Sequence, residues 1–139
     1  MIVLDTNVLS ELMRPRPDPG VLAWVDQAAS IDLCTTAVTQ AEILAGLASM
    51  PAGRRRDGLA AGAATLFDQL FRGRILSFDS RAAPEYAEIV AGRIRDGRSH
   101  APLDCQIAAI TKASRAILAT RNTRDFDEYG FEIINPWTA

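Results

Sequence analysis

Short runs of apolar residues alternate along the chain with longer segments in which apolar residues recur at helical spacing. The short runs predict strands over residues 2–4, 31–35, 75–78, 116–119 and 131–134. The longer segments predict a first helix between Asp5 and Pro15, and further helices over residues 19–29, 38–50, 54–71, 83–97 and 102–113. Short apolar strands that alternate with helices are typical of a parallel sheet covered by helices on both faces. The pattern therefore predicts an α/β fold.

Length and composition predict a single domain. The chain has 139 residues, 48% of them hydrophobic and 23% charged, as is usual for one compact domain. No repeat or linker divides it, so we expect residues 1–139 to form one unit. No apolar run approaches the roughly 20 residues of a membrane span, and no secretory signal pattern opens the chain. Cys34 and Cys105 lie in apolar segments, which favours buried thiols and a cytoplasmic location.

The net charge of -2 is not that of a protein that holds nucleic acid by bulk positive charge. Lys112 is the only lysine among fifteen basic residues. Arginine favours planar, bidentate contacts with phosphate or carboxylate groups, but codon composition explains the same bias. Charge alone therefore leaves the partner open.

Acidic residues recur at positions that a parallel sheet would bring to one edge. Asp5 follows the strand at 2–4, and a polar run from Asn122 to Asp125 follows the strand at 116–119. Ligands of open parallel sheets bind beyond the carboxyl ends of the strands, where the strand order reverses. We therefore expect these two segments to be neighbours.

Two further acids lie near the starts of helices. Glu42 lies in the first turns of the helix after the strand at 31–35. Asp104 lies in the first turn of the helix that precedes the strand at 116–119, and we expect the start of that helix to be displaced toward the site.

Each acid also has a structural explanation. Asp5 can cap the first helix, and Asp125 can cap the turn that follows it. Glu42 stands three residues after Thr39, the spacing of a capping box, and Asp104 is favourable near the positive end of a helix dipole. These explanations leave out the small residues beside Glu42, which leave room next to its carboxylate.

Carboxylates within a few ångströms of one another repel, which raises their pKa values or requires a cation. Ligands that are all carboxylate, amide or water oxygens favour Mg²⁺ or Mn²⁺ over zinc, and His100 is the only histidine. Such an ion retains water, can activate it as a nucleophile and stabilises charge on phosphate. If the acids meet, the sequence predicts a metal-dependent nuclease.

The acids lie in segments whose residues and order resemble those of PIN-domain ribonucleases, specifically the VapC toxins of bacterial toxin–antitoxin pairs and their FitB-like branch. The segments are 2–11 (IVLDTNVLSE), 37–43 (AVTQAEI), 103–109 (LDCQIAA), 119–126 (ATRNTRDF) and 134–137 (INPW). They extend over essentially the whole chain, and several motifs in register are far more specific than any single acid.

The resemblance implies a Rossmann-like parallel sheet flanked by helices, with the acids at its carboxyl edge. It implies that Asp5 and Asp104 bind the metal directly and that Glu42 completes an acidic pocket. Hydrogen bonds from Thr6 and Thr120 would hold these carboxylates.

A fourth acid would come from the turn after the strand at 116–119. Part of the family has an acid where this chain has Asn122, and Asp125 is the only carboxylate nearby. We therefore expect Asp125 to order a water or a second metal ion, with Asn122 positioning it.

The resemblance also implies partners. Members of the family resemble homodimers that bind a VapB-like antitoxin, whose tail blocks the acidic pocket, often with an arginine. The antitoxin's DNA-binding part represses the operon, so a larger complex on operator DNA is expected. A cluster of acids without a cation attracts a guanidinium, which gives this pairing a physical basis.

An RNA substrate requires positive charge around the pocket. The candidates are Arg14, Arg16, Arg93, Arg95, Arg98, Arg121 and Arg124, each of which could equally be solvated surface charge. Residues 54–56, all arginine, begin a helix and are expected to be surface charge or a dimer contact. Aromatic residues make up only 6% of the chain, and we expect Trp24 and Trp137 in the core or an interface, with RNA selected by shape.

Other classes fit less well. Haloacid-dehalogenase phosphatases need a second acid two residues after the first, where this chain has Asn7, and a receiver domain needs a late lysine after a strand, whereas Lys112 is inside a predicted helix. Neither a dinucleotide-binding nor a P-loop motif is present. A protein that keeps the fold and binds an antitoxin without cleaving RNA remains the alternative.

Overall fold

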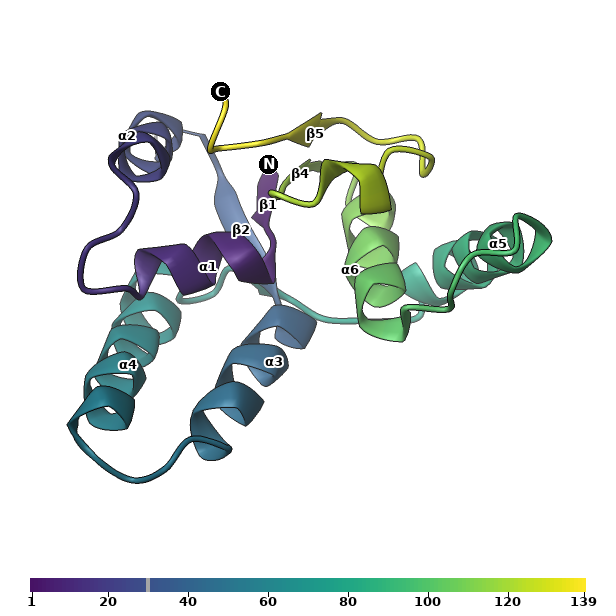
Figure 1. Ribbon diagram of the computed structural model, residues 1–139. Coiled ribbons are helices and arrows are strands. Elements are labelled where there is room, and N and C mark those ends of the chain that lie inside the picture. Colours follow the sequence, from purple (N-terminus) through teal and green to yellow (C-terminus); the bar gives the residue numbers. More distant parts are fainter. Residues whose placement is uncertain (30) are drawn as a thin grey trace.

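A five-stranded parallel sheet organises the computed structural model, which describes residues 1–29 and 31–139 (Figure 1). The strands are β1 (Ile2–Leu4), β2 (Leu33–Thr36), β3 (Ile75–Leu76), β4 (Ile117–Ala119) and β5 (Ile133–Ile134). Their order is β3-β2-β1-β4-β5, so the order reverses between β1 and β4. The predicted α/β class is confirmed.

Six α-helices surround the sheet in the described part of the chain. They are α1 (Thr6–Leu12), α2 (Pro19–Ala28), α3 (Ala37–Ala48), α4 (Arg54–Thr65), α5 (Ala82–Arg95) and α6 (Pro102–Ala113). A π-helical turn, Leu66–Leu70, continues α4, and a 3-10 turn, Thr123–Asp125, follows β4. No helix among the described residues has the length and apolar character needed to cross a membrane.

The core lies on both faces of the sheet because side chains alternate along each strand. In β1, Val3 packs into a cluster with α5 and α6, while Ile2 and Leu4 pack into a second cluster with α1, α2 and α4. Cys34 and Cys105 are buried free thiols, as predicted. The sheet is thus covered by helices on both sides, and only its edges remain open for a site.

The predicted edge strands are too long. Strands at 75–78 and 131–134 were expected, but β3 and β5 each pair only two residues, with a single neighbouring strand. The additional apolar residues pack outside the ladder: Phe78 stacks edge-on against Tyr86, and Phe131 packs against the core. The strand predicted at 31–35 is also shifted to β2, because Ile31 is half exposed whereas Thr36 is buried and pairs with β3.

Candidate active site

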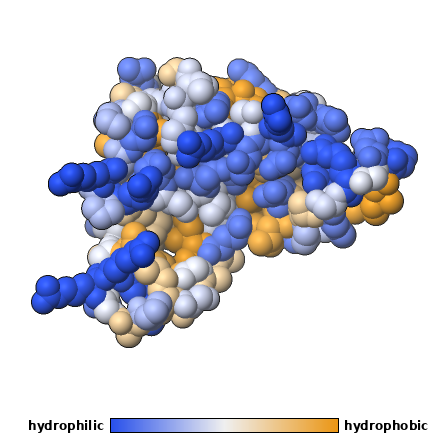
Figure 2. Space-filling view, viewed as in Figure 1, coloured by the Kyte–Doolittle hydropathy of each residue, from blue (hydrophilic) through white to orange (hydrophobic). Residues whose placement is uncertain are grey.

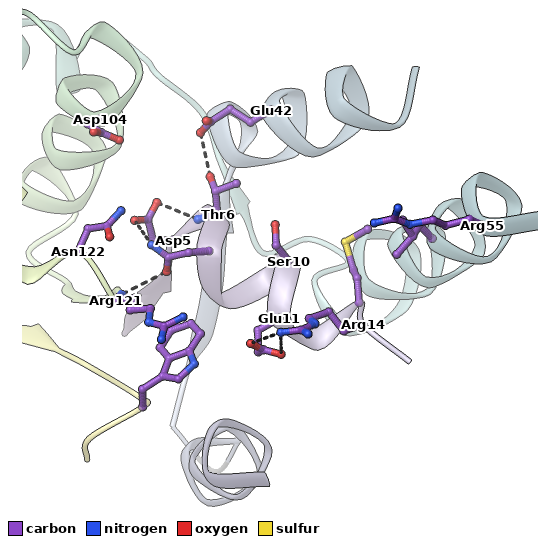
Figure 3. A pocket seen from close by; sticks show the side chains of 14 residues that line it. Asp5, Thr6, Ser10, Glu11, Arg14, Glu42, Arg55, Asp104, Arg121 and Asn122 are labelled. Carbon is purple, nitrogen blue, oxygen red and sulfur yellow. Dashed lines mark hydrogen bonds and ion pairs between the residues drawn. The ribbon is translucent and has the colours of Figure 1, made fainter. Parts of the chain in front are cut away.

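A cavity of about 740 Å³ opens beside the point where the strand order reverses. Asp5, Glu42, Asp104 and Asn122 all line it, from four different parts of the chain (Figure 3). Asp5 follows β1, and its backbone amide donates to the Ala119 carbonyl (3.0 Å), which joins it to the end of β4. The structure therefore brings Asp5, Glu42 and Asp104 to one cavity at this edge, whereas Asp125 does not line it.

Asp5 is the most buried of these acids, with 4% of its surface exposed. Its carboxylate accepts hydrogen bonds from the Thr6 amide (2.8 Å) and from the Thr120 hydroxyl (2.8 Å). Burial raises the pKa of Asp5 to about 6, and the charges of Asp104 and Glu42 add to that rise against the effect of the hydrogen bonds. No ion pair among the described residues includes Asp5. It caps α1 and also faces the cavity, so both interpretations of Asp5 apply.

Glu42 is held by the helix that Asp5 caps. The Thr6 hydroxyl donates to Glu42 Oε1 (2.8 Å) and lies 3.1 Å from the Thr39 hydroxyl. The capping-box prediction is wrong, because Thr36 is the cap of α3 and accepts from the Thr39 amide (3.0 Å). Glu42 therefore has no role in starting its helix, and its carboxylate faces the site.

Asp104 lies in the first turn of α6 and is half buried. Desolvation raises the pKa of its carboxyl, the charges of Asp125 and Glu42 add to the rise, and Arg93 opposes it. The expected displacement of this helix is unnecessary. The helix leads into β4, and the amide of Ile117, at the start of β4, donates to the Met1 carbonyl at the amino edge of the sheet. Helix α6 therefore ends at the amino edge and begins at the carboxyl edge.

The turn after β4 places Asn122 on the cavity wall and the carboxylate of Asp125 near it. Asn122 lines the cavity, and its backbone amide donates to the Thr120 hydroxyl (3.1 Å). Asp125 lies one turn further and acts on Asp104 through its charge. The hydrogen bonds expected from Thr6 and Thr120 are both present, one to Glu42 and one to Asp5.

One predicted RNA contact is wrong. Arg93 is buried, with 6% of its surface exposed, because its Nε donates to the Ser99 carbonyl (2.6 Å) and its guanidinium also donates to the Tyr129 hydroxyl. It ties α5 to the loop before α6 and is not available to RNA.

Sequence reasoning missed part of the cavity wall. The lining residues that it missed are Asn7, Ser10, Glu11, Met13, Arg55, Leu59 and Trp137. Most come from α1 and α4, which meet only in three dimensions. Trp137 could have been found, because it follows the strand predicted at 131–134 and must emerge at the same edge as Asp5.

The donor groups fit a hard divalent cation by their chemistry, since they are carboxylate, amide and hydroxyl oxygens. Among residues 1–29 and 31–139, no three acidic, thiol or imidazole groups converge closely enough to form a ready-made metal site. Mg²⁺ keeps several waters and needs only one or two carboxylates from a protein. The carboxylates of Asp5 and Asp104, neither of which belongs to an ion pair within the described residues, can supply that number.

A parallel α/β sheet with the carboxylates of Asp5, Glu42 and Asp104 on one cavity at its switch point defines the class of protein: an α/β domain whose site suits a hard cation beside a phosphate group. A model of the PIN domain matches residues 2–132, and the chain belongs to this family.

Known proteins resemble the chain over its full length. It is 42% identical to VapC ribonuclease Y4jK of Sinorhizobium fredii, over 99% of this chain and 98% of that one. It is 38% identical to toxin FitB of Neisseria gonorrhoeae, over 99% of each. The solved structure of FitAB bound to an IR36 DNA fragment superposes with a TM-score of 0.88 and 38% identity, over 99% of this chain and 96% of that one.

Proposed function

We propose that this protein is a divalent-metal-dependent endoribonuclease and the toxin of a type II toxin–antitoxin pair. The observation that carries the proposal is the position of Asp5, a buried carboxylate with no cation partner among the described residues, in one cavity with Asp104 and Glu42. The likeness to a VapC ribonuclease and to toxin FitB supports RNA as the substrate.

In this proposal Asp5 and Asp104 bind Mg²⁺ or Mn²⁺, and Glu42 completes the acidic pocket. A bound ion would supply Lewis-acid stabilisation of the phosphate and an activated water as nucleophile. Thr120 and Thr6 hold the carboxylates of Asp5 and Glu42 in place by hydrogen bonds, while Asp125 and Asn122 orient water at the β4 side.

The decisive experiment is cleavage of total RNA by the purified, antitoxin-free protein with Mg²⁺, with Mn²⁺ and with chelator. We expect discrete fragments that require metal and that Asp5→Asn protein does not produce. Absence of cleavage by folded wild-type protein under every condition would overturn the nuclease and favour the alternative, a PIN domain that binds an antitoxin without cutting RNA.

We propose that a VapB-like antitoxin neutralises the protein by placing a guanidinium among the acids. Two observations support this: Asp5 has no ion pair within the described residues, and the chain is similar to the protein in the FitAB complex with DNA. The second observation also supports assembly on operator DNA.

The two free, buried thiols agree with action in the cytoplasm, and the single sheet agrees with one domain over residues 1–139.

We propose further that the protein is a homodimer. An apolar groove between α3 and the start of α6 is lined by Val38, Phe78 and Leu103, and the space-filling view shows hydrophobic surface there (Figure 2). Phe78 is 39% and Leu103 46% exposed, which is unusual for large apolar side chains in one groove. Sedimentation of Leu103→Glu protein, expected to be monomeric, tests this assignment.

A further inference from the structure

Two residues at the ends of neighbouring strands form a cation–π stack on the wall of the cavity that holds the acids. Arg121 lies two residues beyond β4, and Trp137 three residues beyond β5. Because β4 and β5 pair in parallel, both residues emerge at the same edge of the sheet. The guanidinium carbon of Arg121 lies 4.9 Å from the centre of the Trp137 ring, and both residues line the cavity that holds Asp5 and Asp104 (Figure 3).

The backbone on each side of the stack is anchored. The Arg121 amide donates to Asn7 Oδ1 (3.2 Å), which ties it to the helix that Asp5 caps. The Trp137 amide donates to Asn135 Oδ1 (3.0 Å), and its partly buried ring packs against the core cluster that includes Leu4 and Ala119. The backbone that carries both side chains is therefore held in place beside the acids.

Arg121 also carries a charge that no carboxylate neutralises within the described residues. It is exposed and belongs to none of the ion pairs there, whereas Arg14, another arginine of the cavity wall, is bound to Glu11. The carboxylates of Asp5 and Asp104 repel the phosphates of an approaching polyanion unless a cation lies close to them. Arg121 is placed to supply that cation.

We propose that the Arg121–Trp137 stack is a substrate subsite that binds one nucleotide of single-stranded RNA beside the phosphodiester bond that is cut. The N–H edge of Arg121 binds the phosphate, since a guanidinium fork matches two phosphate oxygens. The base stacks on the free face of the guanidinium, whose other face lies over the indole, as unpaired bases do on aromatic and arginine faces. The subsite rests on the proposed ribonuclease function and names how that site holds its substrate.

The test uses the full-length, antitoxin-free protein and a synthetic single-stranded RNA that spans a cut site mapped in total RNA. Arg121→Gln and Trp137→Leu remove the two halves of the stack, and Trp137→Phe keeps an aromatic ring. Arg72→Gln removes an exposed charge outside the cavity and is the matched control. Thermal unfolding of each variant shows whether it is folded.

We expect KM to rise about tenfold or more in Arg121→Gln and Trp137→Leu, with kcat within about threefold of wild type. Arg72→Gln should stay within about threefold of wild type in both constants, and the KM of Trp137→Phe, which keeps a smaller ring, should lie between those of wild type and Trp137→Leu. The slope of log KM against log salt concentration should fall by about 0.7 in Arg121→Gln, because one phosphate contact is lost, and should not change in Trp137→Leu. This difference separates the phosphate contact from the stacking contact.

The possible failures are distinct. If wild-type protein cuts no RNA, the proposed function fails and the subsite falls with it. A second failure is that wild-type protein cuts RNA but the folded Arg121→Gln and Trp137→Phe variants have the same KM and salt slope as Arg72→Gln. If Trp137→Leu is then either unfolded or equally unchanged, the subsite is wrong and the nuclease stands. Unchanged KM with weakened antitoxin binding would assign the stack to the protein partner instead.

Discussion

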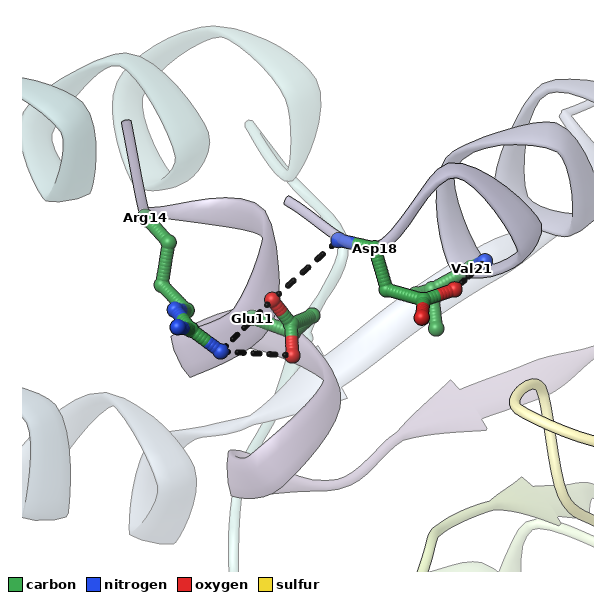
Figure 4. A network of polar contacts seen from close by, with 4 residues as sticks. All are labelled: Glu11, Arg14, Asp18 and Val21. Carbon is green, nitrogen blue, oxygen red and sulfur yellow. Dashed lines mark hydrogen bonds and ion pairs between the residues drawn. The ribbon is translucent and has the colours of Figure 1, made fainter. Parts of the chain in front are cut away.

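Two buried carboxylates lie at opposite ends of α1, and their surroundings differ. Asp5 caps the first turn, and Glu11 lies in the last, each about as buried as the other, with 4% and 6% exposed. Glu11 is bound to Arg14 (3.3 Å) and accepts from the Asp18 amide (3.3 Å), and Asp18 in turn caps α2 (Figure 4). Asp5 has hydrogen bonds from Thr6 and Thr120 but no cation partner within the described residues.

The contrast separates architecture from function on one helix. A buried charge is costly unless it is paired, so Glu11 and its partners stabilise the connection between α1 and α2. Asp5 has no cation partner within the described residues, and two more acids line the same cavity, an arrangement that a bound cation would stabilise. Paired carboxylates indicate structure, and unpaired ones indicate a binding site.

The largest expected effect follows from removing the unpaired charge. Asp5→Asn and Asp104→Asn should each lower the rate of RNA cleavage by about 1,000-fold or more, because each would remove one of the two metal ligands proposed above. Both should remain folded by circular dichroism. The rate is measured on total RNA and then on a mapped oligonucleotide, and a fully active Asp104→Asn protein would contradict the site assignment.

The second effect concerns pH and stability. The pKa of Asp5 is about 6 in the fold against a reference of 3.8, so the folded state holds this proton more tightly. Ionisation of Asp5 therefore lowers the free energy of unfolding. This loss is absent below about pH 4, grows up to about pH 6 and stays constant above it, at about 3 kcal/mol at most.

Asp5→Asn should therefore raise the free energy of unfolding by about 1–3 kcal/mol at pH 8 and by almost nothing at pH 4. Urea unfolding in chelator at the two pH values measures the difference. A gain of equal size at both would mean that ionisation of Asp5 is not its cause. Cleavage by the wild type should also fall as the pH drops through about 6, because protonated Asp5 is a poor metal ligand.

Sequence patterns predicted the central strands and the acids at their ends. The apolar run of β1 is unambiguous because it is buried on both faces, and Asp5 directly after it is fixed by covalent connection. Asp104 was expected at this edge only if the start of its helix were displaced, but a helix that leads into a parallel strand already begins at the carboxyl edge, so no displacement is needed.

Contacts between distant segments were harder to predict. Thr39 and Glu42 have capping-box spacing, yet Thr36 begins the helix one turn earlier and leaves Thr39 beside Thr6. Arg93 has the spacing of a surface residue, but the nearby Ser99 carbonyl and Tyr129, much further along the chain, bury it. Such partners depend on how helices pack, which no local pattern encodes.

The paired carboxylate should affect stability more than chemistry. Glu11→Gln removes the charge that Arg14 and the Asp18 amide share, and should lower the free energy of unfolding by about 1 kcal/mol. The effect is modest because the Arg14 side chain is 66% exposed and can be solvated. The kcat of RNA cleavage should stay within about threefold of wild type. A loss comparable to that of Asp5→Asn would erase the distinction between the two carboxylates.

The smallest effect should follow from adding an acid to the unpaired group. Asn122 is exposed on the cavity wall, and its backbone amide, which any residue retains, makes the hydrogen bond to Thr120. Asn122→Asp should therefore cleave RNA within about fivefold of wild type, with Asn122→Ala as the control. A further negative charge near Asp5 and Asp104 should move the acid limb of the pH–rate profile up by about half a pH unit, because like charges disfavour ionisation. Severe loss of metal binding in Asn122→Asp protein, measured by Mn²⁺ titration, would show that the fourth acid cannot move within this turn and that Asp125 alone can serve there.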